Sequence, residues 1–248
     1  MTRHVYGLHT VGAILAHDPR HLTGLWVLET RRDARLARLL DAAARAGVAV
    51  HPVGRAELET LAPGARHQGV VAAYAGGPLP LGEADFDGLL AGVEGPPLVL
   101  VLDGVQDPHN LGACLRSADG AGAHAVIAPR DRAVGLTPAA RKVASGAAEA
   151  LPFVQVTNLA RTLRSLKDLG LRVVGAAGAA GQALYDADLT GPLALVLGAE
   201  GAGLRRLTRE ACDELVRIPM AGTVESLNVS VAAAVCLYEA VRQRGFGP

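Results

Sequence analysis

The sequence predicts an α/β protein with two domains, of which the larger, C-terminal one is built on a parallel β-sheet. From Leu98 onward, short all-apolar runs alternate with segments of helical periodicity, as is typical of buried parallel strands and their crossover helices. Half of the 248 residues are hydrophobic, which is enough for a sizeable core. A stretch rich in Gly and Pro separates this region from a smaller N-terminal one.

The N-terminal region, residues 1–75, is predicted to be a small α/β domain. Apolar residues at helical spacing (Leu36, Leu39, Leu40) and a following Gly47 indicate a helix in its middle. We expect helices at 8–16, 34–46 and 55–61 and strands at 25–28, 48–50 and 70–74.

Residues 76–97 are predicted to be a linker. Gly and Pro punctuate both of its ends, and the part between carries acidic residues without a basic one. We expect this acidity to keep the linker away from nucleic acid and to leave it mobile. The large domain then comprises residues 98–248.

The large domain alternates strands and helices along most of its length. Because the strand candidates are short and apolar, the pattern predicts a sheet covered on both faces but leaves the strand order open. We expect strands at 98–102, 125–127, 154–156, 173–176, 193–197 and 215–218, and helices at 111–121, 138–144, 159–169 and 229–244.

Charge and composition exclude several functional classes. The net charge is zero, and residues 1–75 carry nine Arg against six acidic residues, so any RNA binding must use local Arg clusters. Aromatic residues make up only 3%, which argues against an aromatic platform for stacked bases. The three Cys have no metal-ligand spacing, which indicates inert thiols in a reducing cytoplasm and no metal site. No apolar run is long enough for a membrane span.

The first segment that carries chemistry follows the strand predicted at 98–102. Asp107-Pro-His-Asn110 is typical of a turn and a helix N-cap. Asn110 and Arg116 are six residues apart, nearly two turns of a helix, and we expect them to share a face only if the helix begins by Asn110. Without further information, Asn110 could be merely a cap and Arg116 a solvated residue.

The second segment is a loop with Gly198, Gly201 and Gly203, which follows the strand at 193–197. Glycines here would let a ligand approach the backbone closely. Their order matches neither the dinucleotide fingerprint nor a phosphate-binding P-loop, which argues against a nucleotide-dependent Rossmann enzyme. Glu200 in this loop is either a solvated charge, a partner for an Arg, or a group that holds a ligand hydroxyl or ammonium.

The third segment joins the last strand to the last helix. A strand stops at Pro219, and either Ser226 or Asn228 caps the helix that follows. Backbone N–H groups at such a helix start are unpaired within the helix, and a strand that ends against one is a common ligand position. An ordinary strand–loop–helix joint is the alternative interpretation.

Together the three segments resemble the signature motifs of the SpoU/TrmH family of RNA ribose 2′-O-methyltransferases, within the knotted SPOUT class. The matching residues are Asn110 with Arg116, Gly198-Ala-Glu-Gly201, and Ser226-Leu-Asn228. Residues 5–11 and 67–71 also resemble the N-terminal substrate domain of the branch that methylates a guanosine of bacterial 23S rRNA. The resemblance therefore covers almost the whole chain.

The resemblance implies a fold and a cofactor. It implies a parallel-sheet domain with a deep trefoil knot, and an N-terminal RNA-binding domain like the ribosomal-protein fold of L30e and L7Ae. S-adenosylmethionine would be the methyl donor, bent among three loops. The implied cofactor-binding residues are Gly198, Ile218, Met220 and Leu227, with Met220 on the adenine side.

The resemblance also implies the catalytic residues, which are Arg116, Asn110, Glu200, Ser226 and Asn228. Family accounts consider the arginine as a general base for the ribose 2′-hydroxyl. An arginine holds its proton tightly, however, and removing it near neutral pH would cost about 8 kcal/mol. We therefore expect a charged Arg116 that stabilises the developing alkoxide and grips the adjacent phosphate, oriented by the other four residues.

The implied partners are 23S rRNA, in its peptidyltransferase region, or a ribosomal assembly intermediate, and a second copy of the chain. Val231, Val235, Leu237 and Val241 of the last helix are predicted to contribute to that homodimer. Two alternatives remain. One is a tRNA ribose methyltransferase of the same family, and the other is a catalytically silent RNA-binding assembly factor.

Overall fold

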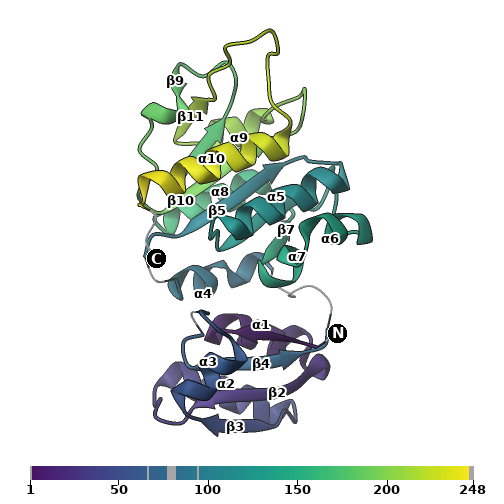
Figure 1. Ribbon diagram of the computed structural model, residues 1–248, viewed down its shortest axis with the longest axis vertical. Coiled ribbons are helices and arrows are strands. Elements are labelled where there is room, and N and C mark those ends of the chain that lie inside the picture. The colour runs from purple at the N-terminus through teal and green to yellow at the C-terminus, as the bar shows by residue number, and fades with distance from the viewer. Residues whose placement is uncertain (1, 66, 77–81, 94, 246–248) are drawn as a thin grey trace. The chain divides into compact units, whose positions relative to one another are not determined.

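The computed structural model of the chain divides into two compact units, residues 1–92 and 93–248 (Figure 1). The structure describes residues 2–65, 67–76, 82–93 and 95–245. Part of the predicted linker, residues 77–81 and 94, lies outside the described residues. The remainder of that stretch includes a 3-10 turn (Glu83–Asp85) and a short helix, α4 (Phe86–Ala91), which the Gly- and Pro-rich composition did not predict.

The N-terminal unit is built on a mixed four-stranded sheet. Strand β4 lies antiparallel to both β1 and β2, and β2 pairs in parallel with the edge strand β3. The sheet order is β1 (Arg3–Tyr6), β4 (Val70–Tyr74), β2 (Leu22–Leu28) and β3 (Val50–Val53). The helices of residues 1–76 are α1 (Leu8–His17), a 3-10 turn (Pro19–His21), α2 (Ala34–Arg45) and α3 (Arg55–Leu61).

Helix α2 shows how the sequence sets these elements. Its N-cap is Asp33, whose carboxylate accepts hydrogen bonds from the N–H groups of Arg35 and Leu36. Leu36, Leu39 and Ala43 are buried, so one apolar stripe packs on the sheet. The strand expected at 48–50 begins only at Val50, because Val48 N–H instead closes the turn that ends α2 on Ala43 O.

The C-terminal unit contains a seven-stranded sheet in which neighbouring strands are parallel. The order of the strands in the sheet differs from their order in the sequence, since β10 lies between β5 and β8. The order is β7 (Phe153–Val156), β6 (Ala125–Pro129), β5 (Leu98–Asp103), β10 (Leu193–Gly198), β8 (Arg172–Ala176), β11 (Glu214–Arg217) and β9 (Gln182–Ala183).

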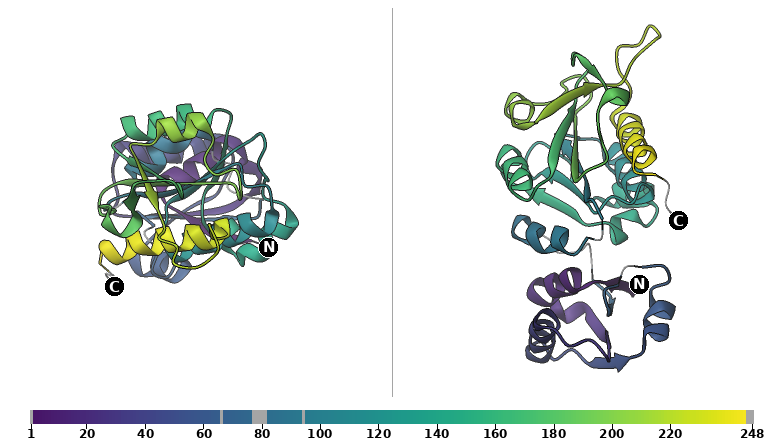
Figure 2. Two further views of the ribbon diagram at one scale, coloured as in Figure 1. Left: turned by 90° about the horizontal axis from the view of Figure 1, so that it is seen from above. Right: turned by 90° about the vertical axis from the view of Figure 1, so that its left-hand side faces the viewer.

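Helices cover both faces of this sheet, which confirms the predicted α/β architecture with a parallel sheet. In the right-hand view of Figure 2, the helices of one layer lie on the opposite side of the strands from those of the other. One layer contains α5 (Pro108–Gly120), α6 (Pro138–Ala144), α7 (Ala147–Ala150) and α10 (Val229–Gln243). The other contains α8 (Leu159–Asp168) and α9 (Arg206–Ala211).

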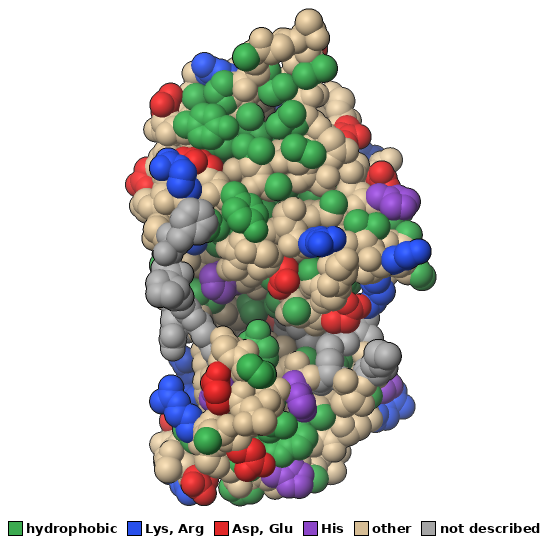
Figure 3. Space-filling model, in the orientation of Figure 1, with side chains coloured by type: hydrophobic (Ala, Val, Ile, Leu, Met, Phe, Trp, Pro, Cys, Tyr) green, Lys and Arg blue, Asp and Glu red, His purple; other side chains and the backbone are tan. Residues whose placement is uncertain are grey.

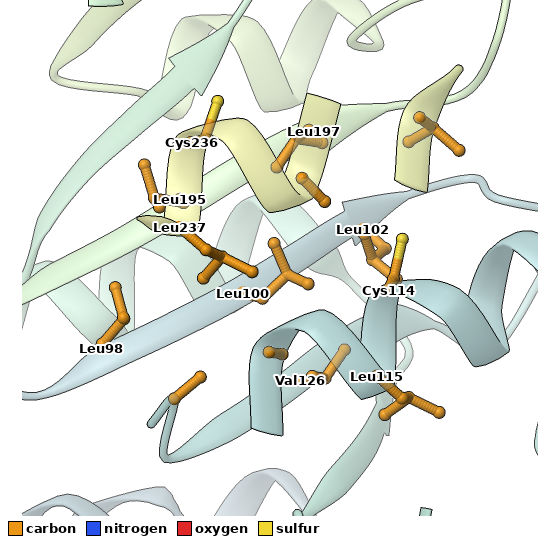
Figure 4. Packing of buried hydrophobic residues seen from close by; sticks show 14 of the residues in the cluster. Leu98, Leu100, Leu102, Cys114, Leu115, Val126, Leu195, Leu197, Cys236 and Leu237 are labelled. Carbon is orange, nitrogen blue, oxygen red and sulfur yellow. The ribbon is translucent and has the colours of Figure 1, made fainter. Parts of the chain in front are cut away.

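The core of the C-terminal unit lies between its central strands and the pair of helices α5 and α10. Figure 4 shows leucines of β5 and β10 packing against side chains of both helices. Cys114 and Cys236 belong to this core, and burial raises the pKa of each thiol to about 12. These two thiols are therefore inert, as the composition predicted. Leu237, expected at a dimer interface, is fully buried in the same core, so that expectation was wrong for this residue.

Glycine allows the closest helix contact in this layer. A Cβ on Gly112 of α5 would lie 2.4 Å from the carbonyl oxygen of Ala140 in α6. The two helices therefore cross at backbone distance, and this contact fixes the segment that begins with Asn110. Across the described residues, no helix is both long enough and apolar enough to cross a membrane.

Candidate active site

A cavity of about 360 Å³ lies at the carboxyl edge of the parallel sheet, beside the ends of β8, β10 and β11. Small-molecule sites in open α/β proteins occupy this edge, where the strand order changes direction. The lining includes all four residues predicted to bind the cofactor, Gly198, Ile218, Met220 and Leu227, and two predicted catalytic residues, Glu200 and Ser226.

The loop after β10 is shaped by its glycines. Gly201 and Gly203 have φ values of 72° and 64°, in the left-handed region that favours glycine. A Cβ on Gly198 would lie 2.0 Å from the backbone carbon of Gly203. The space beside Gly198 is thus filled by the returning loop itself. Gly198 is therefore required for the loop to close, and it also lines the cavity, where the predicted close approach of a ligand to the backbone stays a prediction.

A buried carboxylate, which the sequence did not single out, anchors the far end of the same loop. Asp103 ends β5 and is 1% exposed. It accepts hydrogen bonds from Arg205 N–H (2.9 Å) and Arg205 Nε (2.5 Å), and its backbone oxygen accepts from Ala199 N–H. The loop from Ala199 to Arg205 is therefore fixed at both ends to strand β5.

The three motifs are joined by hydrogen bonds, because Asn110 of the first and Asn228 of the third both contact Glu200 of the second. Asn110 Nδ2 donates to Glu200 Oε1 at 3.3 Å, and Asn228 Nδ2 donates to the same oxygen at 2.5 Å. Asn228 Nδ2 also donates to Asn110 Oδ1 at 3.0 Å. Glu200 was expected to be a solvated charge, a partner for an arginine or a group that holds a ligand. Within the described chain its hydrogen-bond partners are two side-chain amides and one backbone N–H. We call Asn110, Glu200 and Asn228 the polar triad.

The start of α10 is satisfied within the protein. Asn228, rather than Ser226, is the N-cap, and its Oδ1 accepts from Ser230 N–H at 2.9 Å. Val229 N–H donates to Glu200 Oε1 at 3.3 Å. The first two backbone donors are therefore already paired, which corrects the expectation that they point outward to a ligand. The cap also orients the Asn228 amide, leaving its Nδ2 to face Glu200.

Helix α5 begins at Pro108, so Asn110 and Arg116 lie on one helix. Asp107 caps it, accepting a hydrogen bond from His109 N–H at 2.8 Å. That backbone bond and the nearby His109 ring hold the pKa of the Asp107 carboxyl below its usual range, against a smaller effect of desolvation. The cap fixes the turn of α5 from which Asn110 reaches Glu200.

Arg116 lies elsewhere on the same helix. Six residues at 3.6 per turn place its side chain roughly 120° around the axis from Asn110. The expectation that a helix beginning by Asn110 puts the two residues on one face was therefore wrong. Arg116 is exposed and does not line the cavity. No hydrogen bond or ion pair joins it to the rest of the described chain. The structure thus brings together Asn110, Glu200 and Asn228 but not Arg116, which the other four residues were expected to orient.

The cavity offers two kinds of surface. Leu197, Ile218, Met220 and Leu227 supply apolar contacts, and the chain between them supplies backbone polar groups. Glu200 and Glu225 place exposed carboxylates at its border. This combination fits a ligand with an apolar or aromatic part and a positive charge. In the described part of the chain, no cluster of three or more His, Cys, Asp or Glu is arranged to hold a metal ion.

The fold and this site define a parallel α/β protein with a cavity at the carboxyl edge of its sheet, lined by the chain that follows β8, β10 and β11. Residues 97–238 match the model of the SpoU rRNA methylase family, and residues 4–77 match that for RNA 2′-O ribose methyltransferase substrate binding. The chain therefore belongs to the SpoU rRNA methylase family.

Curated relatives match over nearly the full length. The 23S rRNA (guanosine-2′-O-)-methyltransferase RlmB of Ralstonia nicotianae is 59% identical over 98% of this chain and 96% of its own. The protein of the same name from Photobacterium profundum is 56% identical over 97% of each. Among solved structures, the SpoU methyltransferase AviRb of Streptomyces viridochromogenes, in complex with AdoMet, has a TM-score of 0.62 and 29% identity, covering 99% of this chain and 91% of that one.

Proposed function

We propose that this protein transfers a methyl group from S-adenosylmethionine to the ribose 2′-hydroxyl of a guanosine in 23S rRNA. The observation that carries the proposal is the convergence of three motifs, spread from Asn110 to Asn228, on one carboxylate at the border of one cavity. Full-length similarity to RlmB proteins supports the substrate.

The cofactor would lie in the cavity at the edge of β8, β10 and β11. Gly198 and the backbone of Ile218 and Leu227 would hold it, and Met220 would contact its adenine side. When bound, S-adenosylmethionine supplies a methyl group on a positively charged sulfur, which is a good leaving group. The carboxylates of Glu200 and Glu225 complement that charge, and the chain itself must supply alignment and proton removal.

The catalytic residues would divide into two groups. The polar triad fixes the loops that define one wall of the site, and Ser226 faces the ribose from the exposed part of the 218–228 loop. Arg116 would stabilise the developing alkoxide and grip the adjacent phosphate as a charged guanidinium. Its exposure and its lack of a partner in the described chain support a role toward a ligand that arrives from outside.

We further propose the organisation that the family implies. Residues 1–75 would be an RNA-binding domain of L30e/L7Ae type, residues 76–97 a linker, and residues 98–248 the methyltransferase domain in the cytoplasm. The insertion of β10 between β5 and β8, and the return of the chain from β11 to α10, support a deep trefoil knot at the C-terminal end. The exposed Val231 supports a homodimer contact on α10.

The test is methyl transfer from radiolabelled S-adenosylmethionine to in vitro-transcribed 23S rRNA and to a bulk tRNA transcript, with the product mapped by ribose-methylation sequencing. We expect one 2′-O-methylguanosine in the 23S rRNA and none in tRNA. Labelling of tRNA alone would identify the tRNA enzyme of the family. Tight cofactor binding without transfer to 23S rRNA or an assembly intermediate would overturn the proposal.

A further inference from the structure

Three aromatic rings lie together on one face of the N-terminal sheet. The imidazole of His51 in β3 stacks on the indole of Trp26 in β2, with ring centroids 5.6 Å apart and an interplanar angle of 28°. His4 of β1 meets the same indole edge-on, at 5.8 Å and 88°. Trp26 is half-buried and both imidazoles are exposed. We call His4, Trp26 and His51 the aromatic cluster; it presents ring surface to solvent.

Backbone register assembles the cluster. Trp26 pairs directly with His51 across the parallel β2–β3 ladder. Gly24, two residues earlier on the same face of β2, leaves room for the indole, because a Cβ there would lie 2.9 Å from Trp26 Cη2. The low aromatic content of the sequence predicted no such platform, and only this register brings three rings from three strands to one place.

The sheet face that carries the cluster is only partly covered. Helix α3 packs on this face through Leu58 and Ala62, which form a small apolar cluster with Val53 and Val71, and Trp26 lies at its border. Figure 2, in its right-hand view, shows α1 and α2 across the sheet from α3. A seven-residue helix is about 10 Å long, whereas four strands span roughly 14 Å, so α3 leaves part of the face open.

The chemistry of this open face suits RNA. Within the four strands as the structure bounds them there is no Asp or Glu, so no carboxylate of the sheet opposes a phosphate backbone. Two of the three rings are imidazoles, whose ring nitrogens can form hydrogen bonds. Figure 3 shows His side chains beside hydrophobic ones on the N-terminal unit. Aromatic rings of this kind stack on unpaired bases with little dependence on sequence.

We infer that the aromatic cluster is a stacking site for an unpaired base of the RNA substrate. The inference rests on the proposed function for the identity of that RNA. It assigns the small domain a single-strand contact at its sheet face, so the domain would select substrates that carry unpaired nucleotides.

The sole tryptophan provides a direct test, because all indole emission comes from Trp26. We expect a single-stranded RNA 12-mer to quench the emission of the full-length protein, and a duplex of the same length to leave it nearly unchanged. Intact RNA binding by filter assay without a change in emission would overturn the inference. So would an emission change that follows protein concentration alone, since this would identify a second copy of the chain as the occupant.

A variant tests the contribution to substrate recognition. His51→Ala removes an exposed ring, and we expect it to weaken single-stranded RNA binding and to raise KM for 23S rRNA about tenfold. Its kcat and its affinity for S-adenosylmethionine should stay unchanged. Tyr185→Ala, which removes an exposed ring of the other unit, is the matched control and should alter neither parameter.

The outcomes separate this inference from the proposed function. An unchanged KM in His51→Ala, with full activity, would overturn the stacking site while leaving the methyltransferase intact. Quenching by single-stranded RNA in a protein that methylates no RNA would overturn the proposed function and preserve the site. Trp26→Phe, which keeps a ring at the border of the apolar cluster, should retain RNA affinity, and a loss as large as that of His51→Ala would contradict stacking.

Discussion

The start and the middle of helix α5 differ sharply in how they are held. Asn110, in its first turn, is bound to Glu200 and Asn228, residues 90 and 118 positions away. Arg116, less than two turns later, is exposed and meets no partner in the described chain. One wall of the site is therefore fixed by hydrogen bonds within the chain, whereas the group proposed to act on the ribose has no partner in the described chain and is exposed to an incoming substrate.

The largest effect on activity should come from replacing Arg116, the exposed residue of α5. Arg116→Ala should reduce methyl transfer by roughly 10²–10³-fold, as expected for loss of a charge that stabilises the transition state. Because Arg116 does not line the cavity, calorimetric affinity for S-adenosylmethionine should change less than about twofold.

Arg116→Lys separates two roles of that residue. A lysine releases its proton more readily than an arginine but lacks the planar fork that grips a phosphate. Weak activity in this variant supports electrostatic stabilisation, and strong activity would favour a general base. Near-normal turnover by Arg116→Ala would remove the residue from the mechanism altogether.

The second-largest effect should come from a substitution that disrupts the loop carrying Glu200. Gly198→Ala places a Cβ 2.0 Å from the Gly203 backbone, so the loop must open and the triad must separate. We expect a loss of roughly 1–3 kcal/mol in unfolding free energy, measured by urea titration, together with weakened cofactor binding. Gly178→Ala is the matched control, because Gly178 lines the same cavity with nothing near its added Cβ. Equal stability of the two variants would show that the loop does not need its glycine.

A smaller effect is expected from the acceptor of the triad. Glu200→Ala removes the partner of two amides and of Val229 N–H, and should weaken S-adenosylmethionine binding about tenfold by calorimetry. Glu225→Ala removes another exposed carboxylate from the same cavity, but one outside the triad, and should change the affinity by less than about threefold. If both variants lose the same affinity, charge alone matters and the triad geometry does not.

The smallest effect should come from the cap of α5. Asp107→Ala should lower the melting temperature by a few degrees, since a helix start loses its side-chain acceptor. The depressed pKa of Asp107 means that its contribution is present above the ordinary carboxyl pKa of 3.8 and is lost as pH falls through the lower folded value. The melting difference from the parent protein should therefore be present at pH 7 and shrink below about pH 4. A difference that grows in acid would contradict this cap.

The elements of the sheet were largely predictable because their signals are local. The apolar runs at 70–74 and 193–197 and the periodic segments at 55–61 and 138–144 became β4, β10, α3 and α6 with little or no change in bounds. Strand β3 was displaced because it contains His51 and Pro52, which a strand tolerates at a sheet edge but which do not resemble a buried run.

The site was predictable only where its residues form compact motifs. Asn110, Glu200 and Asn228 were expected to act together, and they are hydrogen-bonded to one another. Their bonding to each other rather than to Arg116 depends on helix phase and on long-range register, which no local pattern contains. Asp103 escaped notice for the same reason, since its partner Arg205 lies 102 residues further along the chain.

The long sequence separation between Asp103 and its partner Arg205 also has a consequence for protein synthesis. A ribosome that has released only the first half of this chain has made Asp103 and Asn110 but not Glu200, Arg205 or Asn228. A product of that length can form neither the Asp103–Arg205 pair nor the polar triad. If the proposed cofactor site is correct, the chain cannot bind the methyl donor until residues up to the start of α10 have been made. S-adenosylmethionine should not change the rate of proteolysis of a nascent chain arrested before residue 228. It should slow the proteolysis of a chain extended past α10.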